Sequence, residues 1–395
     1  MNDIVLVAIL CICGSLIVYH HVGYPLLLKW YARQHPIQAK EHQPRCYKKS
    51  RADRAYPSIT ILVPAYNEQQ WIAEKLRNLA ALDYPRKRLK VLVICDGCTD
   101  DTVAIAQQTI QEAICADRHF EIRDYSTNRG KVAVINEQML TIKSDITAMT
   151  DVSALLAIDA LLIAAKHFQN PRTGVLNSRY QLLNQQNIGE AQYWQFQNAL
   201  QADEACFGAS IGAHGALYFF RTHLFTPLSD NTINDDFVIP MDIVRQGYIA
   251  EYDKNLVAIE LEPTNSSNDF KRRLRISAGN MQQAIQLSDL FLPRYKQVAF
   301  AFLSGKGLRL ATPYLMILCL ITNILLSHYW FFTATLLLQL AVYAIGIFSY
   351  LFPSIFHHKL CQMMMYLITG HYANLVGGLR YLLGLENGKW QRIQR

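Results

Sequence analysis

The sequence predicts an α/β domain that has transmembrane helices on both sides of it. Short runs of β-branched and apolar residues alternate with segments of helical spacing from residue 58 onward. This order is typical of a mostly parallel sheet with right-handed crossovers. Both ends of the 395-residue chain are apolar, and only 17% of all residues are charged, against about 25% in average soluble chains. The length is sufficient for a soluble domain together with several membrane segments.

The N-terminal segment predicts the first transmembrane helix. Residues 4–19 and 22–28 are almost wholly apolar, and Lys29, Arg33 and Lys40 follow them. A secretory signal peptide carries its positive charge before the apolar core rather than after it. Because the cytoplasmic flanks of membrane helices are rich in Lys and Arg, we expect residues 1–29 to span the membrane with the N-terminus outside. Residues 30–56 are then expected to form a cytoplasmic linker.

Charge and cysteine usage bear on the partners and the compartment. The formal net charge is +7, and much of the basic excess flanks the apolar segments, which favours membrane lipids as partners. No basic run is interleaved with aromatic residues, so we expect no nucleic acid partner. The nine cysteines have no regular spacing, which favours a reducing compartment. Cys95 and Cys98 have the spacing of a zinc or redox pair, but no second pair of this kind exists to complete a zinc site.

Strands and helices alternate regularly in the first half of the soluble domain. The expected strands are residues 58–63, 88–94, 119–124 and 144–148, and the expected helices are residues 68–82, 102–115 and 131–143. The first strand is expected to stop at Pro64. After Asp151 the alternation is looser, with helices expected at 157–168, 193–205 and 234–246 and strands at 173–183 and 217–221. The domain as a whole is predicted to cover residues 57–285.

The C-terminal part predicts two further spans and one helix at the membrane surface. Residues 286–310 are expected to form an amphipathic interfacial segment, and residues 311–352 two transmembrane helices joined by a tight hairpin. The last apolar segment, residues 360–383, contains Gln362, His371, Asn374 and Arg380. If it spanned, the basic tail would lie outside, against the positive-inside bias. We therefore expect residues 353–395 to form an interfacial or re-entrant helix and a cytoplasmic tail, with a fourth span as the alternative.

Charged residues at the ends of the expected strands indicate a site for a nucleotide diphosphate. Asp96 follows the second strand, Asp151 follows the fourth, Lys131 begins a helix, and Asp235 and Asp236 come later. The carboxyl ends of parallel strands meet at one edge of a sheet, where such sheets bind ligands. Hard cations, which accompany diphosphates, take oxygen ligands. The chain has neither G-x-G-x-x-G after the first strand nor a Walker phosphate loop, so a dinucleotide enzyme and a P-loop enzyme are not expected.

Six short motifs follow one another along the chain: residues 63–68 (VPAYNE), 96–100 (DGCTD), 130–131 (GK), 150–151 (TD), 212–216 (GAHGA) and 234–237 (NDDF). In this order they resemble the motifs of membrane-bound family-2 glycosyltransferases, the group that includes the cellulose, hyaluronan and poly-N-acetylglucosamine synthases. Each motif is weak alone, but six in order are specific. The resemblance covers roughly residues 57–285 and implies a cytoplasmic domain of the GT-A (Rossmann-like) α/β fold.

The resemblance also implies how the nucleotide would be bound. The turn after the first strand would pack on the uracil of a UDP-sugar, and its residues are Pro64, Ala65, Tyr66 and Glu68. Asp96 would bind the base or the ribose, and Lys131 would approach the diphosphate.

The same resemblance implies the groups that act on the sugar. Asp151 would be the first acid of the family's DxD motif and would hold magnesium or manganese. Asp236 would be the general base that deprotonates the acceptor hydroxyl, so that the sugar is transferred with inversion while UDP leaves on the metal. Asp235 is expected to bind substrate or to open the helix, and it is the alternative base. His214, where related sequences often have Asn, would contact the acceptor.

Departures from the family pattern bear on the metal and on the acceptor. The second acid of the DxD motif is replaced by Ser153, so the metal would have one carboxylate fewer. Residues 272–276 stand where the family has Gln-x-x-Arg-Trp; Arg275 matches the Arg and would hold the diphosphate, with Arg272 beside it. Ile276 replaces the Trp, which argues against long-chain processive synthesis. In the tail, Trp390 resembles part of the gating segment of hyaluronan-type synthases.

We therefore predict a multi-pass enzyme of a bacterial inner (plasma) membrane that uses a UDP-sugar. Its acceptor would be a growing cell-surface polysaccharide or a lipid-linked molecule, and export or synthase subunits are possible partners. One alternative is the transfer of a single sugar to a lipid carrier without polymerisation. The other is a membrane scaffold that binds sugar nucleotides without catalysis, which the replacements at Ser153 and Ile276 suggest.

Overall fold

The computed structural model describes residues 3–37, 44–183, 188–262, 266–352, 355–356 and 358–386. Contacts within the chain divide it into two compact units. The sheet unit contains His35–Asn184 and Gln201–Thr264, and the helix unit contains Met1–Gln34, Gln185–Leu200 and Asn265–Asn387. The helix Ile188–Ala205 (α7) contributes residues to both units.

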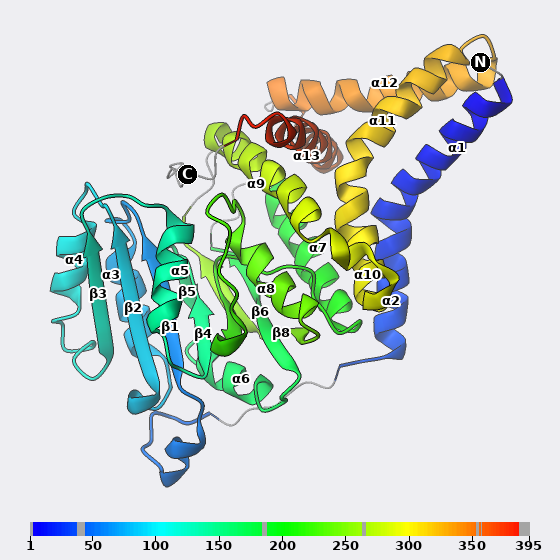
Figure 1. Ribbon diagram of the computed structural model, residues 1–395. Helices are drawn as coiled ribbons and strands as arrows, with labels where there is room; N and C mark the ends of the chain where they lie inside the picture. The colour runs from blue at the N-terminus through cyan, green and yellow to red at the C-terminus, as the bar shows by residue number, and fades with distance from the viewer. Residues whose placement is uncertain are drawn as a thin grey trace. The chain divides into compact units, whose positions relative to one another are not determined.

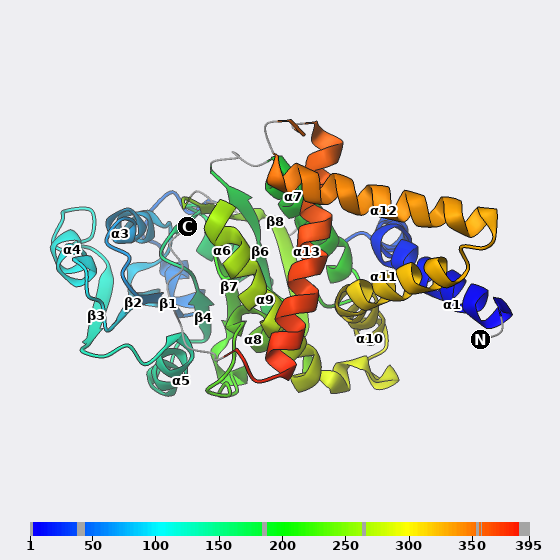
Figure 2. The ribbon, with the colours of Figure 1, turned by 90° about the horizontal axis from the view of Figure 1, so that it is seen from above.

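The sheet unit is built on one eight-stranded sheet in the order β3-β2-β1-β4-β7-β6-β8-β5 (Figure 1). The strands are β1 (Ile59–Ala65), β2 (Leu89–Asp96), β3 (His119–Tyr125), β4 (Ile146–Met149), β5 (Ala154–Leu156), β6 (Thr173–Leu182), β7 (Tyr218–Arg221) and β8 (Ile249–Glu260). The helices of this unit, apart from part of α7, are α3 (Ile72–Ala81), α4 (Thr102–Thr109), α5 (Lys131–Thr141), α6 (Ala160–His167) and α8 (Asp235–Arg245). Figure 2 shows α3 and α5 on opposite faces of the β1–β2 part of the sheet.

The first four strands form the parallel half that the sequence predicts. Strand β1 pairs in parallel with β2 and β4, and β2 pairs in parallel with β3. All seven residues of β1 and all four of β4 are buried, as is usual for parallel strands that helices cover on both faces. The carboxyl ends of β1, β2 and β4 therefore lie at the same edge of the sheet.

The second half of the sheet adds antiparallel pairs, which the alternation of strands and helices does not predict, to a parallel pair of β6 and β8, so the sheet as a whole is mixed. Strand β7 runs antiparallel to both β4 and β6, and β5 runs antiparallel to β8. The reason lies in the loop of small residues at 208–217, which delivers the chain to the carboxyl end of β4, where Tyr218 pairs with Met149. From there the chain can only run back along β4.

Two local predictions also differ from the structure. Strand β1 continues through Pro64 to Ala65, because its pairing with β4 ends at Leu62 and the missing N–H of proline leaves no gap on that side. The sequence predicts neither the short strand β5 nor strand β8. For β8 the reason is a polar interruption. Its apolar alternation is interrupted by Asp253, Lys254 and Asn255, and the structure accommodates this stretch with a register shift against β6.

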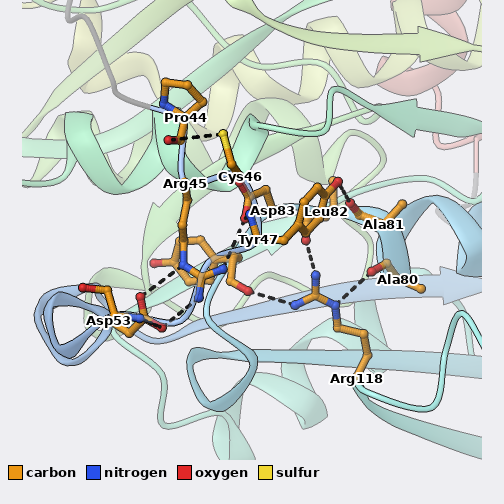
Figure 3. Close-up of polar contacts among 12 residues, drawn as sticks. Pro44, Arg45, Cys46, Tyr47, Asp53, Ala80, Ala81, Leu82, Asp83 and Arg118 are labelled. Carbon is orange, nitrogen blue, oxygen red and sulfur yellow. Dashed lines mark hydrogen bonds and ion pairs between the residues drawn. The ribbon is translucent and has the colours of Figure 1, made fainter.

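The C-terminal end of α3 is held by two arginines from distant segments (Figure 3). Arg118 donates to the carbonyl oxygens of Ala80 and Tyr84, at 2.9 Å each, and to that of Leu82. Arg45 donates through separate nitrogens to Asp53 (2.7 Å) and Asp83 (3.2 Å). The contacts of Arg118 satisfy carbonyl groups at and just after the C-terminal end of α3, which a helix end leaves open. The contacts of Arg45 attach the segment before β1 to the turn after α3.

The helix unit consists of long apolar helices with a basic helix beside them. Its elements are α1 (Asp3–Val18), the π turn Tyr19–Gly23, α2 (Tyr24–Gln34), α9 (Ser266–Gln286), α10 (Gln297–Ala301), the π turn Phe302–Gly307, α11 (Leu308–Leu325), α12 (Trp330–Leu351) and α13 (Lys359–Leu382). Within this unit α1 runs beside α11, and α13 contacts α9 and α12 (Figure 1). The basic segment that contains Arg272 and Arg275 is part of α9.

Three helical stretches are long and apolar enough to cross a membrane. They are Asp3–Gln34, Gln297–Leu325 and Trp330–Leu351, with 32, 29 and 22 residues. Their number agrees with the three spans predicted from the sequence. In the part of the chain that the structure describes, α13 does not reach the same apolar composition, and its placement at the membrane surface stays a prediction.

Candidate active site

The turns after β1 and β2 are bound to each other at the carboxyl edge of the sheet. Pro64 and Ala65 end β1 and are followed by the turn residues Tyr66, Asn67 and Glu68. The side chain of Asn67, whose φ is 56°, accepts from the amide of Thr99 (2.8 Å) and donates to its hydroxyl (3.1 Å). The amide of Glu68 donates to the hydroxyl of Thr102 (2.7 Å). These bonds join the two turns into one surface. The family resemblance implies that the uracil binds there.

Asp96, the last residue of β2, is fully buried and holds the loop that leads to Lys131. Its carboxylate accepts from the amides of Arg129 (3.0 Å) and Gly130 (2.8 Å). Gly97 has a φ of 68°, and a side chain there would meet the backbone of Asn128 at 2.2 Å, so the glycine is required. The structure therefore gives Asp96 a positioning contact, while its predicted contact with the base or ribose stays a prediction.

Lys131, the first residue of α5, lies between two of the predicted acids. Its ammonium is 3.3 Å from a carboxylate oxygen of Asp151 and 3.2 Å from one of Asp235. Burial lowers the pKa of Lys131, but the nearby charges of Asp151, Asp235 and Asp236 outweigh it and raise the pKa above its ordinary value. The lysine is therefore a fixed positive charge among three carboxylates. The sequence predicted its approach to a diphosphate, and the ion pairs place it beside the acids.

Gly215 connects Asp151 with Asp236. Its amide donates to the carboxylate of Asp236 (3.1 Å), and its carbonyl accepts from the amide of Asp151 (3.0 Å). A Cβ atom at this position would lie 2.6 Å from Asp151 Oδ2. Asp236 is the second residue of α8, and its main-chain carbonyl accepts from the amide of Ala213 (3.1 Å). The loop of small residues therefore brings the predicted metal ligand and the predicted base to one place.

His214 lies in the same loop and stacks on Tyr180. The two ring centroids are 3.8 Å apart with an angle of 27° between the planes. Nδ1 of His214 accepts from the amide of Ala216 (3.1 Å), so in the neutral ring the proton is on Nε2. The stacked ring has a fixed orientation and a fixed tautomer. Its predicted contact with an acceptor stays a prediction.

Tyr218 lies fully buried at the start of β7, close to the acids. Burial, together with the charges of Asp235, Asp236 and Asp151, raises the pKa of its hydroxyl well above the ordinary value. Its hydroxyl makes no hydrogen bond within the described residues. Because it stays protonated, it can act only as a neutral group near the carboxylates. Nothing in the sequence distinguishes Tyr218 from the other aromatic residues of a buried strand.

Lys75 is the clearest residue that sequence reasoning missed. It is fully buried on α3, and its ammonium donates to the hydroxyl of Thr150 (2.6 Å) and to the carbonyl of Ala154. Burial lowers its pKa to about 7, although the charges of Asp151 and Glu260 act in the opposite direction. A signal exists in the sequence: a lysine stands three residues after Ile72, on the apolar stripe of the helix.

Three predicted residues lie outside the described part of the sheet unit. Arg272 and Arg275 are on α9 of the helix unit, so their predicted contact with the diphosphate stays a prediction. Trp390 lies outside the described residues.

A divalent cation would find a sparse set of protein ligands. No group of three His, Cys, Asp or Glu side chains within the described parts of the chain could hold a metal ion. Ser153, which replaces the second acid, is buried, with only 7% of its surface exposed. The side chain of Asp151 is 36% exposed, so its carboxylate is accessible to a metal ion. Such a site fits magnesium or manganese held by one carboxylate together with substrate phosphates and waters, which is a common arrangement for magnesium.

Comparisons with known proteins identify the family of the chain. The profile of the family described as glycosyltransferase-like family 2 matches residues 57–279. Poly-beta-1,6-N-acetyl-D-glucosamine synthase of Staphylococcus aureus is 23% identical over 241 residues, which are 59% of this chain and 56% of that protein. The enzyme of the same name from Staphylococcus epidermidis is 22% identical over 229 residues, which are 56% of this chain and 54% of that protein. The chain thus spans about half the length of the curated relatives it matches.

A solved structure shares the fold over almost the whole chain. It is a mannosyltransferase from Pyrobaculum calidifontis in complex with GDP-Man and Mn2+. The TM-score is 0.71 at 22% sequence identity, and the match covers 96% of this chain and all of the other. The mixed sheet with its helices therefore has the GT-A fold, as the sequence predicts.

Proposed function

Because this chain belongs to glycosyltransferase family 2, we propose that it is an inverting enzyme that transfers a sugar from a UDP-sugar. The acceptor is a growing cell-surface polysaccharide or a lipid-linked molecule at a bacterial inner membrane. The names of the staphylococcal relatives, which are polysaccharide synthases, support a polysaccharide. The three helices that are apolar enough to span a membrane support the location.

One observation carries the proposal: Lys131 bridges Asp151 and Asp235, and Gly215 connects Asp151 with Asp236. A fixed positive charge next to the predicted metal ligand is what a leaving diphosphate requires. A carboxylate held in place by a main-chain amide, as that of Asp236 is by Gly215, is suited to accept the proton of a hydroxyl. These contacts support the proposed roles of Asp151 as metal ligand, Lys131 as phosphate cation and Asp236 as base.

In this mechanism the residues have separate tasks. The turn after β1 and Asp96 hold the nucleotide, and Lys131 stabilises the negative charge on the departing diphosphate. Asp236 accepts the proton of the acceptor hydroxyl as this hydroxyl attacks the anomeric carbon from the side opposite to the diphosphate. Asp151 would hold magnesium or manganese, which when bound would neutralise part of the diphosphate charge. Asp235 stays paired with Lys131 and orients it.

A second candidate is the transfer of one sugar to a lipid carrier without polymerisation. Ile276 at the place of the family's Trp is the observation that favours it. The length of the product separates the two candidates. A ladder of long chains requires polymerisation, whereas a single lipid-bound sugar indicates one transfer per acceptor.

The test measures release of UDP and the size of the product. The purified full chain, in lipid, is given radiolabelled UDP-sugars with magnesium or manganese. The wild-type protein is expected to release UDP, and Asp236→Asn is expected to lower the rate by about 10²–10⁴-fold, the usual contribution of a general base. Asp230→Asn, which changes an exposed acid a few residues before α8, serves as the matched control and should keep the wild-type rate. Full activity of Asp236→Asn would remove Asp236 from the mechanism.

A further inference from the structure

We propose that Lys75 is a positioning residue for sugar transfer. Its ammonium binds the turn that contains Asp151. Through the hydroxyl of Thr150 it also holds the loop that contacts Asp236. This inference rests on the proposed function. Lys75 does not reach the substrate edge of the sheet directly; it acts through the main chain and through one hydroxyl.

The first step of the argument is the position of the ammonium. Lys75 is fully buried, and it donates to Thr150 on one side of Asp151 and to the carbonyl of Ala154 on the other. The turn between these two contacts contains Asp151 and the buried Ser153. A cation that binds both ends of the five-residue segment from Thr150 to Ala154 fixes the shape of this turn. The direction of the Asp151 side chain follows from that shape.

The second step is the connection to the other acid. The hydroxyl of Thr150 accepts from Lys75 and donates to the carbonyl of Ala216 (2.6 Å). The residue before Ala216 is Gly215, which contacts both Asp151 and Asp236. A continuous set of hydrogen bonds therefore runs from α3 through Thr150 to the loop between the two carboxylates.

The third step is the cost of placing a lysine there. A buried charge is strongly unfavourable unless it is hydrogen-bonded and compensated by other charges. A methionine would fill the same volume in this apolar helix face without that cost. The negative charges of Asp151 and Glu260 stabilise the ammonium and offset part of the cost of burying it. The contacts at both ends of the turn are the gain that a methionine could not provide.

A neighbour on the same helix face provides the matched control. Asn78, three residues after Lys75, donates to the carbonyl of Leu156 and accepts from its amide, both at 2.9 Å. Lys75 and Asn78 thus attach the same segment to the same helix. Only Lys75 binds the part that contains Asp151, whereas Asn78 binds the last residue of β5.

The central experiment compares Lys75→Met with Asn78→Leu in the full chain. Both variants should lower the melting temperature. Lys75→Met should also lower kcat by roughly 10–100-fold, because a displacement of about 1 Å in a reacting group has effects of this size. Its affinity for UDP without metal should stay unchanged, and the gain in UDP affinity on adding Mn2+ should shrink. Asn78→Leu should keep kcat and the effect of Mn2+.

Variants of Thr150 test whether the effect passes through its hydroxyl. Thr150→Ser should keep kcat, and Thr150→Val should lower it. The double variant Lys75→Met/Thr150→Val should be no slower than the slower single variant, because both changes break the same connection. A folded Lys75→Met protein with wild-type kcat, or single effects that multiply in the double variant, would overturn the proposal.

Failure of the proposed function can be distinguished from failure of the proposal for Lys75. If the wild-type protein transfers no sugar from any UDP-sugar, the reaction is wrong, and thermal unfolding then decides the Lys75 contact alone. Losses of melting temperature that are less than additive in the double variant would support the contact. Fully additive losses would contradict it.

Discussion

Replacing Gly215 with alanine should reduce activity by moving one carboxylate while leaving the fold intact. The added Cβ would lie 2.6 Å from Asp151 Oδ2, whereas ordinary contact begins at 3.4 Å. The carboxylate of Asp151 must therefore move by about 0.8 Å. Misplacement of a reacting group by about 1 Å can cost roughly 10²-fold in rate. The backbone accepts alanine here, because the φ of Gly215 is not in the left-handed region.

The assay measures kcat for UDP release together with the melting temperature of the same preparation. Gly215→Ala should lower kcat by one to two orders of magnitude, as worked from the displacement, with a nearly unchanged melting temperature. Gly247→Ala is the reverse control. Gly247 has a φ of 96° and no atom within 4 Å of an added Cβ, so alanine there should cost about 1–2 kcal/mol of stability and keep kcat. A Gly215→Ala protein with wild-type kcat would refute the reasoning that Asp151 must keep its place.

Two further predictions concern stability and pH. Arg118→Met removes the hydrogen-bond donors to the carbonyl oxygens of Ala80, Leu82 and Tyr84. It should lower the free energy of unfolding by about 1–3 kcal/mol, measured as a lower melting temperature in detergent. An unchanged melting temperature would show that water replaces the guanidinium. The Cys95 thiol hydrogen-bonds to Cys98 and lowers the pKa of Cys98 to about 7. A lowered thiol pKa means that the reactive thiolate forms at lower pH. The rate of alkylation of Cys98 by iodoacetamide, located by mass spectrometry, should therefore rise around pH 7 rather than around the ordinary thiol pKa of about 8.5. A rise centred near pH 8.5 would contradict the prediction.

The strand-end positions of Asp96 and Asp151 could be predicted because they depend on local patterns. Each follows a short apolar run, and the structure ends β2 at Asp96 and places Asp151 two residues after β4. The parallel pairing of these strands then brings their ends to one edge. The apolar composition of the three candidate spans could be predicted for the same reason, since length and hydropathy belong to continuous segments.

The second half of the sheet could not be predicted from such patterns. Strand β8 contains a polar interruption at Asp253, Lys254 and Asn255, and a strand signal that depends on alternation is lost there. The direction of β7 depends on where the preceding loop delivers the chain, which is a property of the folded sheet. Sequence periodicity carries no information on either point.

The sequence by itself determined the order of the elements in the first half of the soluble domain, the family-like motifs and the set of charged residues from Asp96 to Asp236. Only the tertiary structure decided which of them meet: that Lys131 pairs with Asp151 and Asp235, and that Gly215 leaves no room for a side chain beside Asp151. Only the tertiary structure shows that Lys75 is buried and contacts Thr150, which is 75 residues away in the sequence. The physical reason is that periodicity reports which face of one element is buried, whereas contacts between distant segments depend on how the elements pack together.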